Sequence, residues 1–159
     1  KGPHGMQGYW GKSEETAKTI VDGWLRTGDL GMMNAEGFVR VVDRSKDMLI
    51  SGGINVYPAE IENALAGIDG LADFAVIGVA DPDWGEVPML VAANSSDGDR
   101  LRAAIERAGS EVLAKFKRPK HLVLMGEPLP RTLSGKISKP TLRQRFPRAP
   151  EGALPLFAK

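Results

Sequence analysis

The chain has 159 residues, of which 42% are hydrophobic and 26% charged, a balance typical of a folded globular protein and not of a disordered one. It contains no cysteine and only two histidines, His4 and His121, which excludes disulfides and thiolate chemistry and argues against a metal site. No run of eighteen apolar residues occurs, so no membrane span is predicted and the expected location is the cytoplasm.

The net charge of +1 conceals a strong asymmetry along the chain. Residues 1–99 contain 7 Lys and Arg against 16 Asp and Glu, a net of −9, whereas residues 100–159 contain 14 against 4, a net of +10. Two interpretations remain open: the basic part binds an anion, or the two parts attract one another within the fold.

The first 43 residues predict one helix and two short strands. Ser13, followed by two acidic residues, is a suitable helix start. Residues 24–26 and 38–42 are strand candidates, with a turn at 34–37 before the second. The highly charged segment 43–47 then predicts a domain boundary on the surface.

The next part predicts a tight hairpin followed by a helix. Residues 48–50 and 54–56 flank Ser51-Gly52-Gly53, a turn that requires positive φ. Pro58 fits the first turn of a helix whose apolar stripe is formed by Ile61, Leu65 and Ile68.

The remaining elements complete an α+β pattern. Residues 74–80 predict a strand buried on both faces, and residues 87–93 a second strand whose start is disfavoured by Pro88. Asp97 is expected to cap a helix with an apolar face formed by Leu101, Ile105, Ala108 and Val112. A short strand at 122–124 and a helix from 138 to about 145 follow. The expected fold is a small, mostly antiparallel sheet with packed helices, preceded by a β-rich segment.

One loop combines the features that bind phosphate. Ser134-Gly135-Lys136 offers a glycine for close approach and a cation. It is not a Walker A loop, because the position five residues before Gly135 is Pro130 and not glycine.

Four ordered motifs resemble the adenylate-forming (AMP-binding) superfamily, in its acyl- and aryl-CoA synthetase branch. They lie at 8–31 (with Trp24-Leu25-Arg26-Thr27-Gly28-Asp29), at 43–62 (Asp43-Arg44-Ser45-Lys46-Asp47 through Ser51-Gly52-Gly53-Ile54-Asn55 to Glu62), at 83–86 and at 130–139 (Pro130-Arg131-Thr132-Leu133-Ser134-Gly135-Lys136). The resemblance covers about residues 2–146.

The resemblance implies a particular organisation. Residues 1–43 correspond to the tail of a large N-terminal AMP-binding domain, and residues 44–159 to the mobile C-terminal domain, with a hinge near 44–47 at Lys46. The phosphate loop, the acyl pocket and the magnesium-binding Glu of such enzymes lie in the large domain, which is the expected partner of this chain. We therefore expect the chain alone to be inactive and able to self-associate.

The resemblance also assigns site residues. Lys136 corresponds to the catalytic lysine at the α-phosphate and the attacking carboxylate, where a cation offsets the repulsion between two anions. Asp29 corresponds to the acceptor for the ATP ribose hydroxyls and Arg44 to a second ribose or phosphate contact. Arg44 could instead form a surface ion pair with Asp43 or Asp47.

Further positions correspond to the thioester step and to the adenylate. Gly52 and Gly53 resemble the loop that lines the coenzyme A tunnel, and Asn55 a polar residue facing AMP. Trp84 is interpreted mainly as a core residue. The basic run 115–120 either contacts coenzyme A phosphates or is a solvated surface.

The expected function is the C-terminal part of an ATP-dependent acid–CoA ligase. Its substrates would be ATP, coenzyme A and a small carboxylic acid, with Mg²⁺ held by the missing domain. Alternatives are the tail of a peptide-synthetase adenylation domain, a luciferase-like enzyme, or an inactive basic module that binds nucleic acid or an acidic partner. No nucleic acid is expected as a partner, because aromatic platforms are sparse and no nucleic-acid motif occurs.

Overall fold

The computed structural model describes residues 1–93 and 97–157, which form two compact units, Lys1–Lys46 and Asp47–Lys159. Unit 1 contains one helix, α1 (Ser13–Thr19), and two hairpins. The first hairpin pairs β1 (Ile20–Val21) with β2 (Trp24–Leu25), and the second pairs β3 (Asp29–Met33) with β4 (Val39–Arg44). The helix start at Ser13 is confirmed, whereas β1 and β3 were not predicted.

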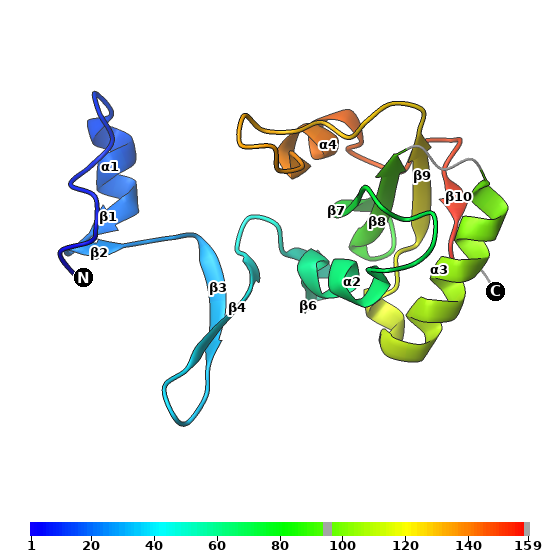
Figure 1. Ribbon diagram of the computed structural model, residues 1–159, viewed down its shortest axis with the longest axis horizontal. Helices are drawn as coiled ribbons and strands as arrows, with labels where there is room; N and C mark the ends of the chain where they lie inside the picture. Colours follow the sequence, from blue (N-terminus) through cyan, green and yellow to red (C-terminus); the bar gives the residue numbers. More distant parts are fainter. Residues whose placement is uncertain (94–96, 158–159) are drawn as a thin grey trace. The chain divides into compact units, whose positions relative to one another are not determined.

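Unit 1 has no hydrophobic core of its own. None of the hydrophobic side chains in residues 1–46, all of which the structure describes, is buried. The β3–β4 hairpin (blue to cyan in Figure 1) instead exposes a set of large apolar side chains: Met32, Met33, Phe38, Val39 and Val41. Such a hairpin has little apolar burial of its own to stabilise it.

Unit 2 is built on one sheet, and its elements follow the expected order except for a last short strand, Leu154–Pro155, which was not predicted. Its strands are β5 (Leu49–Ser51), β6 (Ile54–Val56), β7 (Phe74–Asp81), β8 (Gly85–Ala93), β9 (His121–Met125) and β10 (Leu154–Pro155). Its helices are α2 (Pro58–Leu65), α3 (Gly98–Val112) and α4 (Lys139–Arg145), with a 3₁₀ turn at Lys115–Lys117. All strand pairs are antiparallel except β8–β9, so the predicted mostly antiparallel α+β fold is confirmed.

Strand β8 organises this sheet. It pairs with β7 along most of its length, with β9 from Met89 to Ala93, and with β5 at Gly85. The expectation that Pro88 would weaken the strand start was wrong, because Pro88 lies inside β8 opposite Gly78. Its carbonyl accepts a hydrogen bond from the N–H of Lys120, so the proline is accommodated on the edge facing away from β7.

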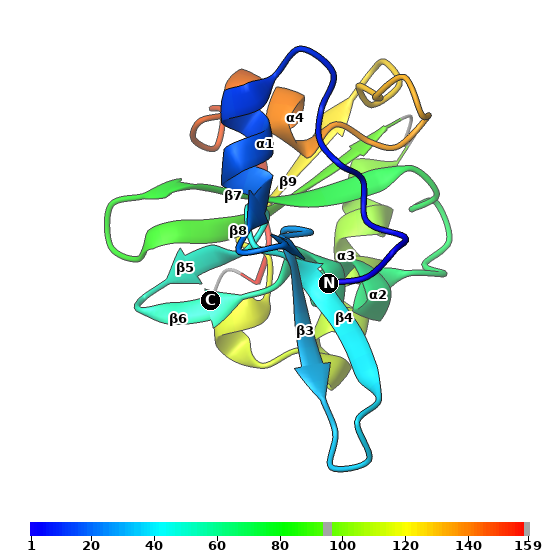
Figure 2. The same ribbon diagram turned by 90° about the vertical axis from the view of Figure 1, so that its left-hand side faces the viewer.

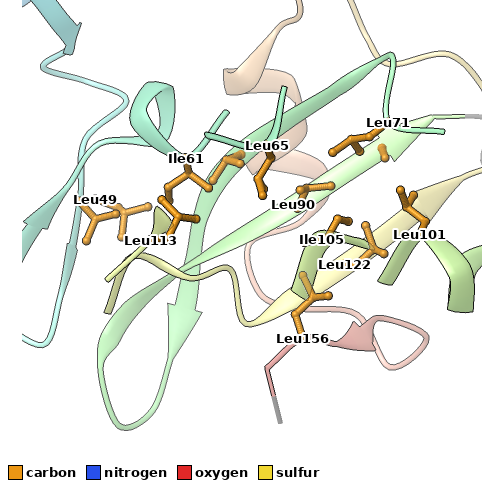
Figure 3. Close-up of a cluster of buried hydrophobic side chains, with 13 residues drawn as sticks. Leu49, Ile61, Leu65, Leu71, Leu90, Leu101, Ile105, Leu113, Leu122 and Leu156 are labelled. Atoms are coloured by element: carbon orange, nitrogen blue, oxygen red, sulfur yellow. The ribbon is translucent and has the colours of Figure 1, made fainter. Parts of the chain in front are cut away.

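Two hydrophobic clusters cover the two faces of the sheet. One cluster packs α2 and α3 on the sheet through Ile61, Leu65, Leu101 and Ile105, as Figure 3 shows. The other packs α4 on the opposite face through Leu142. The strand β7 contributes to both clusters, which confirms that it is buried on both faces. The α3 stripe ends earlier than predicted, because Val112 is exposed at the last residue of the helix.

Local signals in the sequence account for several element boundaries. The Asp97 side chain accepts a hydrogen bond from the N–H of Arg100 at 3.0 Å and caps α3, as predicted. Pro58 occupies the first turn of α2, where its missing N–H has no intrahelical partner to lose.

Candidate functional site

The loop that carries Lys136 is an ordered turn closed by backbone hydrogen bonds. The N–H of Thr132 donates to the carbonyl of Lys136 at 2.8 Å, and the N–H of Gly135 donates to the carbonyl of Thr132 at 2.9 Å. Gly135 has φ +81°, which suits glycine, and Arg131 and Ile137 form an antiparallel bridge at the base. The turn therefore has a fixed backbone, and Lys136 is exposed on it.

The surroundings of Lys136 differ from those of most other basic residues in unit 2. Six ion pairs join a cation from residues 100–159 to an acid from residues 1–99: Arg100–Asp69, Lys117–Glu60, Lys120–Asp81, Arg131–Asp73, Lys139–Glu62 and Arg143–Asp47. Internal attraction therefore accounts for much of the charge asymmetry. The side chain of Lys136, in contrast, has no hydrogen bond, ion pair or ring contact within the described parts of the chain, so its ammonium group is available for an anion.

Unit 1 brings two of the predicted site residues together. Asp29 on β3 and Arg44 on β4 are direct partners in the strand register. The Nε atom of Arg44 lies 3.5 Å from Oδ1 of Asp29, and the Asp29 side chain is 34% exposed. Arg44 therefore pairs with Asp29, a partner that the surface alternative did not name. The carboxylate keeps an oxygen free for further hydrogen bonds.

The turn between β5 and β6 carries the two glycines. Gly52 has φ +56° and Gly53 has φ +81°, which confirms the predicted requirement for positive φ. A Cβ atom added to Gly52 would lie 2.6 Å from Cε3 of Trp84, whereas nothing lies within 4 Å of one added to Gly53. Asn55 follows on β6, is exposed and pairs in register with Ile50. Gly52 is thus required by packing, while Gly53 borders open space.

Trp84 is not a core residue as predicted, because it is 45% exposed and lies over the Gly52 turn. Asp81 holds its loop: the Asp81 Oδ1 atom accepts hydrogen bonds from the N–H groups of Asp83 and Trp84, each at 3.0 Å. Lys120 Nζ lies 3.5 Å from Asp81 Oδ2 and 5.0 Å from the Trp84 ring centroid. Burial raises the pKa of Asp81, but the two N–H groups and the Lys120 ammonium outweigh it, so the pKa lies below its ordinary value.

The basic run 115–120 is largely engaged within the fold. Lys117 pairs with Glu60 at 2.6 Å, and Arg118 donates to two carbonyl groups at the end of α3, each at 3.0 Å. These contacts reduce the number of cations free for phosphate. A pocket of about 310 Å³ nevertheless opens beside this run, and it is lined by residues that include Lys115, Arg118, Lys120, His121 and Phe157.

The predicted site residues fall into separate groups. Asp29 and Arg44 lie in unit 1, while Gly52, Gly53 and Asn55 share one hairpin of unit 2. The loop before α4 that carries Lys136 lies on a different side of unit 2 from the β5–β6 hairpin in both Figure 1 and Figure 2. Lys46 is exposed in the turn between β4 and β5, at the last position of unit 1.

Sequence reasoning missed the supporting contacts of three residues near these groups: Trp84, Arg131 and Asp73. The Arg131 guanidinium bonds both Asp73 and the Lys136 loop. The positive φ of Gly52 already accounts for a glycine there, so no signal in the sequence pointed to its contact with Trp84. No local signal links Arg131 with Asp73, because they are 58 residues apart.

Among the described residues, no group of three or more His, Asp or Glu side chains could hold a metal ion. None of the described helices is long and apolar enough to cross a membrane.

Comparison with known proteins shows which family and which fold this chain is similar to. Residues 60–136 match the AMP-binding enzyme C-terminal domain. Feruloyl-CoA synthase from an Amycolatopsis species is 49% identical over 149 residues, which cover 91% of this chain and 29% of that protein. Long-chain-fatty-acid–CoA ligase FadD13 from Mycobacterium tuberculosis is 40% identical over 141 residues, which cover 89% of this chain and 28% of that protein.

Solved structures agree with the sequence matches. The o-succinylbenzoate CoA synthetase MenE from Bacillus subtilis, in complex with the acyl-adenylate OSB-AMP, gives a TM-score of 0.80 at 35% identity. The match covers 97% of this chain and 30% of that structure. Unit 2 is therefore similar in sequence and fold to the AMP-binding enzyme C-terminal domain. The chain resembles the C-terminal part of adenylate-forming enzymes, as the four motifs predicted, and it spans about three tenths of the relatives it matches.

Proposed function

We propose that this chain is the C-terminal part of an ATP-dependent acid–CoA ligase. In the first half-reaction a carboxylate attacks the α-phosphate of ATP and releases pyrophosphate, which gives an acyl-adenylate. In the second, the thiol of coenzyme A attacks the acyl carbon, and AMP leaves. The observation that carries the proposal is the unpaired ammonium of Lys136 on an ordered turn, in a unit where seven other cations are paired with acids.

Lys136 would serve the first half-reaction. The attacking carboxylate and the triphosphate are both anions, so their approach is opposed by charge repulsion. An ammonium group placed beside the α-phosphate offsets this repulsion and stabilises the charge that develops in the transition state. A long, flexible lysine side chain on a fixed turn has both the reach and the charge for this task.

Asp29 and Arg44 would hold the nucleotide. A carboxylate that stands on a strand can accept hydrogen bonds from both ribose hydroxyls. Arg44, at 3.5 Å from Asp29, fixes the orientation of that carboxylate and adds a positive charge near the phosphates. Asn55 would contribute a polar contact to the adenylate from unit 2.

The β5–β6 turn would serve the second half-reaction. The open space beside Gly53 provides a passage for a thiol-bearing arm. The nucleotide phosphates of coenzyme A would bind at the basic pocket that Lys115 lines. The Lys115 side chain is exposed and has no partner among the described residues.

The separation of these groups requires unit 2 to present two different sides in turn. We propose that Lys46 is the hinge, that residues 1–43 are the tail of a larger N-terminal domain, and that residues 44–159 are the mobile domain. The exposed apolar hairpin of unit 1 supports this division, because such a surface is expected to pack against further parts of the enzyme. That larger domain would also hold Mg²⁺, the acyl pocket and the phosphate loop.

The test measures both half-reactions in the full-length enzyme. Lys136→Ala should lower pyrophosphate release about 10²–10³-fold, while thioester formation from supplied acyl-adenylate stays nearly unchanged. Gly53→Leu should do the reverse, because its side chain blocks the thiol passage. Lys18→Ala removes an exposed lysine of α1 and is the matched control, with no effect expected on either step.

Two results would contradict the proposal. One is equal impairment of both half-reactions by Lys136→Ala and by Gly53→Leu. The other is acyl-adenylate formation by the 159-residue chain alone.

A basic binding module remains the second candidate, favoured only by the net charge of residues 100–159. Seven of those fourteen cations are engaged in ion pairs, which lowers the number available to contact nucleic-acid phosphates. Tight DNA binding with a steep salt dependence would support this candidate over the ligase. For the peptide-synthetase and luciferase-like alternatives, the three relatives above are all named as CoA ligases or synthases, which favours the ligase branch.

A further inference from the structure

The guanidinium group of Arg131 links the loop that carries Lys136 to the central sheet. We propose that Arg131, held in place by Asp73, is a positioning residue that fixes the backbone orientation from which Lys136 acts. This inference rests on the proposed function of Lys136 and adds a device that no motif in the sequence assigns.

Arg131 contacts the sheet and the loop with different nitrogen atoms. Its Nη2 atom donates to Oδ1 of Asp73 at 2.6 Å, and its Nη1 atom donates to the carbonyl oxygen of Gly135 at 2.8 Å. The guanidinium is planar and its N–H groups have fixed directions, so holding one side of it orients the other.

Asp73 is a firm anchor because it belongs to the sheet. It directly precedes β7, and its carbonyl accepts a hydrogen bond from the N–H of Ala93, at the end of β8, at 2.9 Å. The tip of the loop, in contrast, projects into solvent, where Leu133 is fully exposed. Ile137 packs partly against the core at the loop base. Within the described chain, Arg131 provides the charged link between loop and sheet.

The position of these bonds matters for Lys136 in particular. The carbonyl of Gly135 belongs to the planar peptide group that ends at the nitrogen of Lys136. The carbonyl of Lys136 belongs to the next peptide group, and it accepts the hydrogen bond from Thr132. Both peptide planes that flank Lys136 are therefore held, one by Arg131 and one by Thr132. This restricts φ and ψ of Lys136 and hence the direction in which its side chain leaves the backbone.

If Arg131 no longer holds the peptide plane between Gly135 and Lys136, we expect the Lys136 ammonium to be misplaced while the domain stays folded. Reaction rates fall steeply when a catalytic group is displaced by about 1 Å, by roughly 10²-fold. The Arg131 and Asp73 side chains are 46% and 31% exposed, and ion pairs of this kind contribute little to stability. Substitution of Arg131 or Asp73 should thus lower the rate of adenylation strongly and change the melting temperature little.

The experiment uses the full-length enzyme and compares both half-reactions. Arg131→Ala should lower kcat of adenylation by about 10- to 100-fold, change KM for ATP little, and leave thioester formation within about twofold. Asp73→Asn keeps the shape of the anchor but removes its charge, and it should give a smaller loss in the same step. Arg131→Lys, which keeps one charged donor, should recover part of the rate.

A matched control is available in the same unit. Arg145 and Glu127 form an ion pair with side chains that are 50% and 59% exposed, and it makes no bond to the Lys136 loop. Arg145→Ala should leave both half-reactions unchanged. All variants should melt within a few degrees of the parent, and a loss of more than about 10 °C for Asp73→Asn or Arg131→Lys would mean a structural role and overturn the proposal.

A double variant shows whether Arg131 acts through Lys136. In the Lys136→Ala background, adding Arg131→Ala should change the residual adenylation rate by less than about twofold, because there is no ammonium left to position. If the effects of Arg131→Ala and Lys136→Ala on the adenylation rate multiply, the positioning role is wrong. The same holds if Arg131→Ala slows both half-reactions equally, or slows neither. In each of these cases the proposed function of Lys136 stands. If Lys136→Ala itself leaves adenylation intact, the proposed function fails, and this inference fails with it.

Discussion

Alanine substitutions at Gly52 and at Gly53 separate two reasons for glycine in this turn: the positive φ and the contact with the Trp84 ring. Both positions have positive φ, at +56° and +81°, so both variants carry the backbone strain of an L-residue there, about 1–2 kcal/mol. Only Gly52 has a neighbour: the new Cβ would lie 2.6 Å from Cε3 of Trp84 and 2.9 Å from Cζ3. The difference between the two variants therefore measures the contact with the ring.

The difference in unfolding free energy between the two variants depends on how far the Trp84 ring can move away from the new methyl group. Overpacking of a rigid site costs about 1–3 kcal/mol. Trp84 is 45% exposed, so it can swing outward, and the cost then falls to lost packing and a weakened contact with Lys120, worth about 0.5–1 kcal/mol. We expect Gly52→Ala to destabilise unit 2 by about 1 kcal/mol more than Gly53→Ala.

The assay is urea unfolding of the 159-residue chain, followed through amide signals of β7 and β8 so that only unit 2 is reported. With a slope of about 2 kcal/mol per molar urea, the two midpoints should differ by about 0.5 M. In a Trp84→Ala background the difference should vanish. Equal midpoints for the two variants, or a difference that persists without the ring, would refute the packing argument.

Four further outcomes are expected. Leu142→Ala should cost about 2–5 kcal/mol in urea unfolding, since this α4 side chain is fully buried, and a loss below about 1 kcal/mol would show that α4 does not share the core. Burial lowers the pKa of His121 below its ordinary value, and the Asp81 carboxylate opposes this only in part. The unfolded chain then binds the proton more readily, so stability should fall as pH drops from 7.5 to 5, and less so in His121→Gln; an identical pH profile for both chains would contradict this. In the full-length enzyme, Asp29→Ala should raise KM for ATP about 10-fold, as expected for loss of a hydrogen bond to a charged acceptor, and an unchanged KM would remove it from the nucleotide site. Lys46→Pro, which restricts φ at the hinge, should slow thioester formation more than adenylation, and equal rates for the variant and parent would argue against a hinge there.

The parts of the fold that could be predicted are those that short sequence segments determine. The Gly52-Gly53 turn, the Asp97 cap and the doubly buried strand β7 follow from φ requirements, side-chain oxygen placement and apolar runs within a few residues. The order of elements in unit 2 was predicted for the same reason. β10 was missed because it is two residues long and is stabilised by pairing with β9, not by its own sequence.

The sequence motifs predicted the residues of the candidate site, but not the contacts that hold those residues in place. Lys136 stands in a recognisable glycine turn, but its anchor Asp73 lies 58 residues from Arg131, and only folding brings the two together. Trp84 was misjudged for a related reason. Aromatic residues are usually buried, and the hydrogen bonds that hold this one at the surface come from its own loop through Asp81.

The six ion pairs that join residues 100–159 to residues 1–99 also bear on how the chain is made. In each pair the acidic residue is synthesised first, and its basic partner follows 31 to 96 residues later, as in Arg100–Asp69 and Arg143–Asp47. While residues 1–99 leave the ribosome they carry a net charge of −9 with few cations to offset it, so self-repulsion opposes premature collapse and association. The same order delays completion of unit 2 until α4 has emerged, because Arg143, the partner of Asp47, lies in that helix.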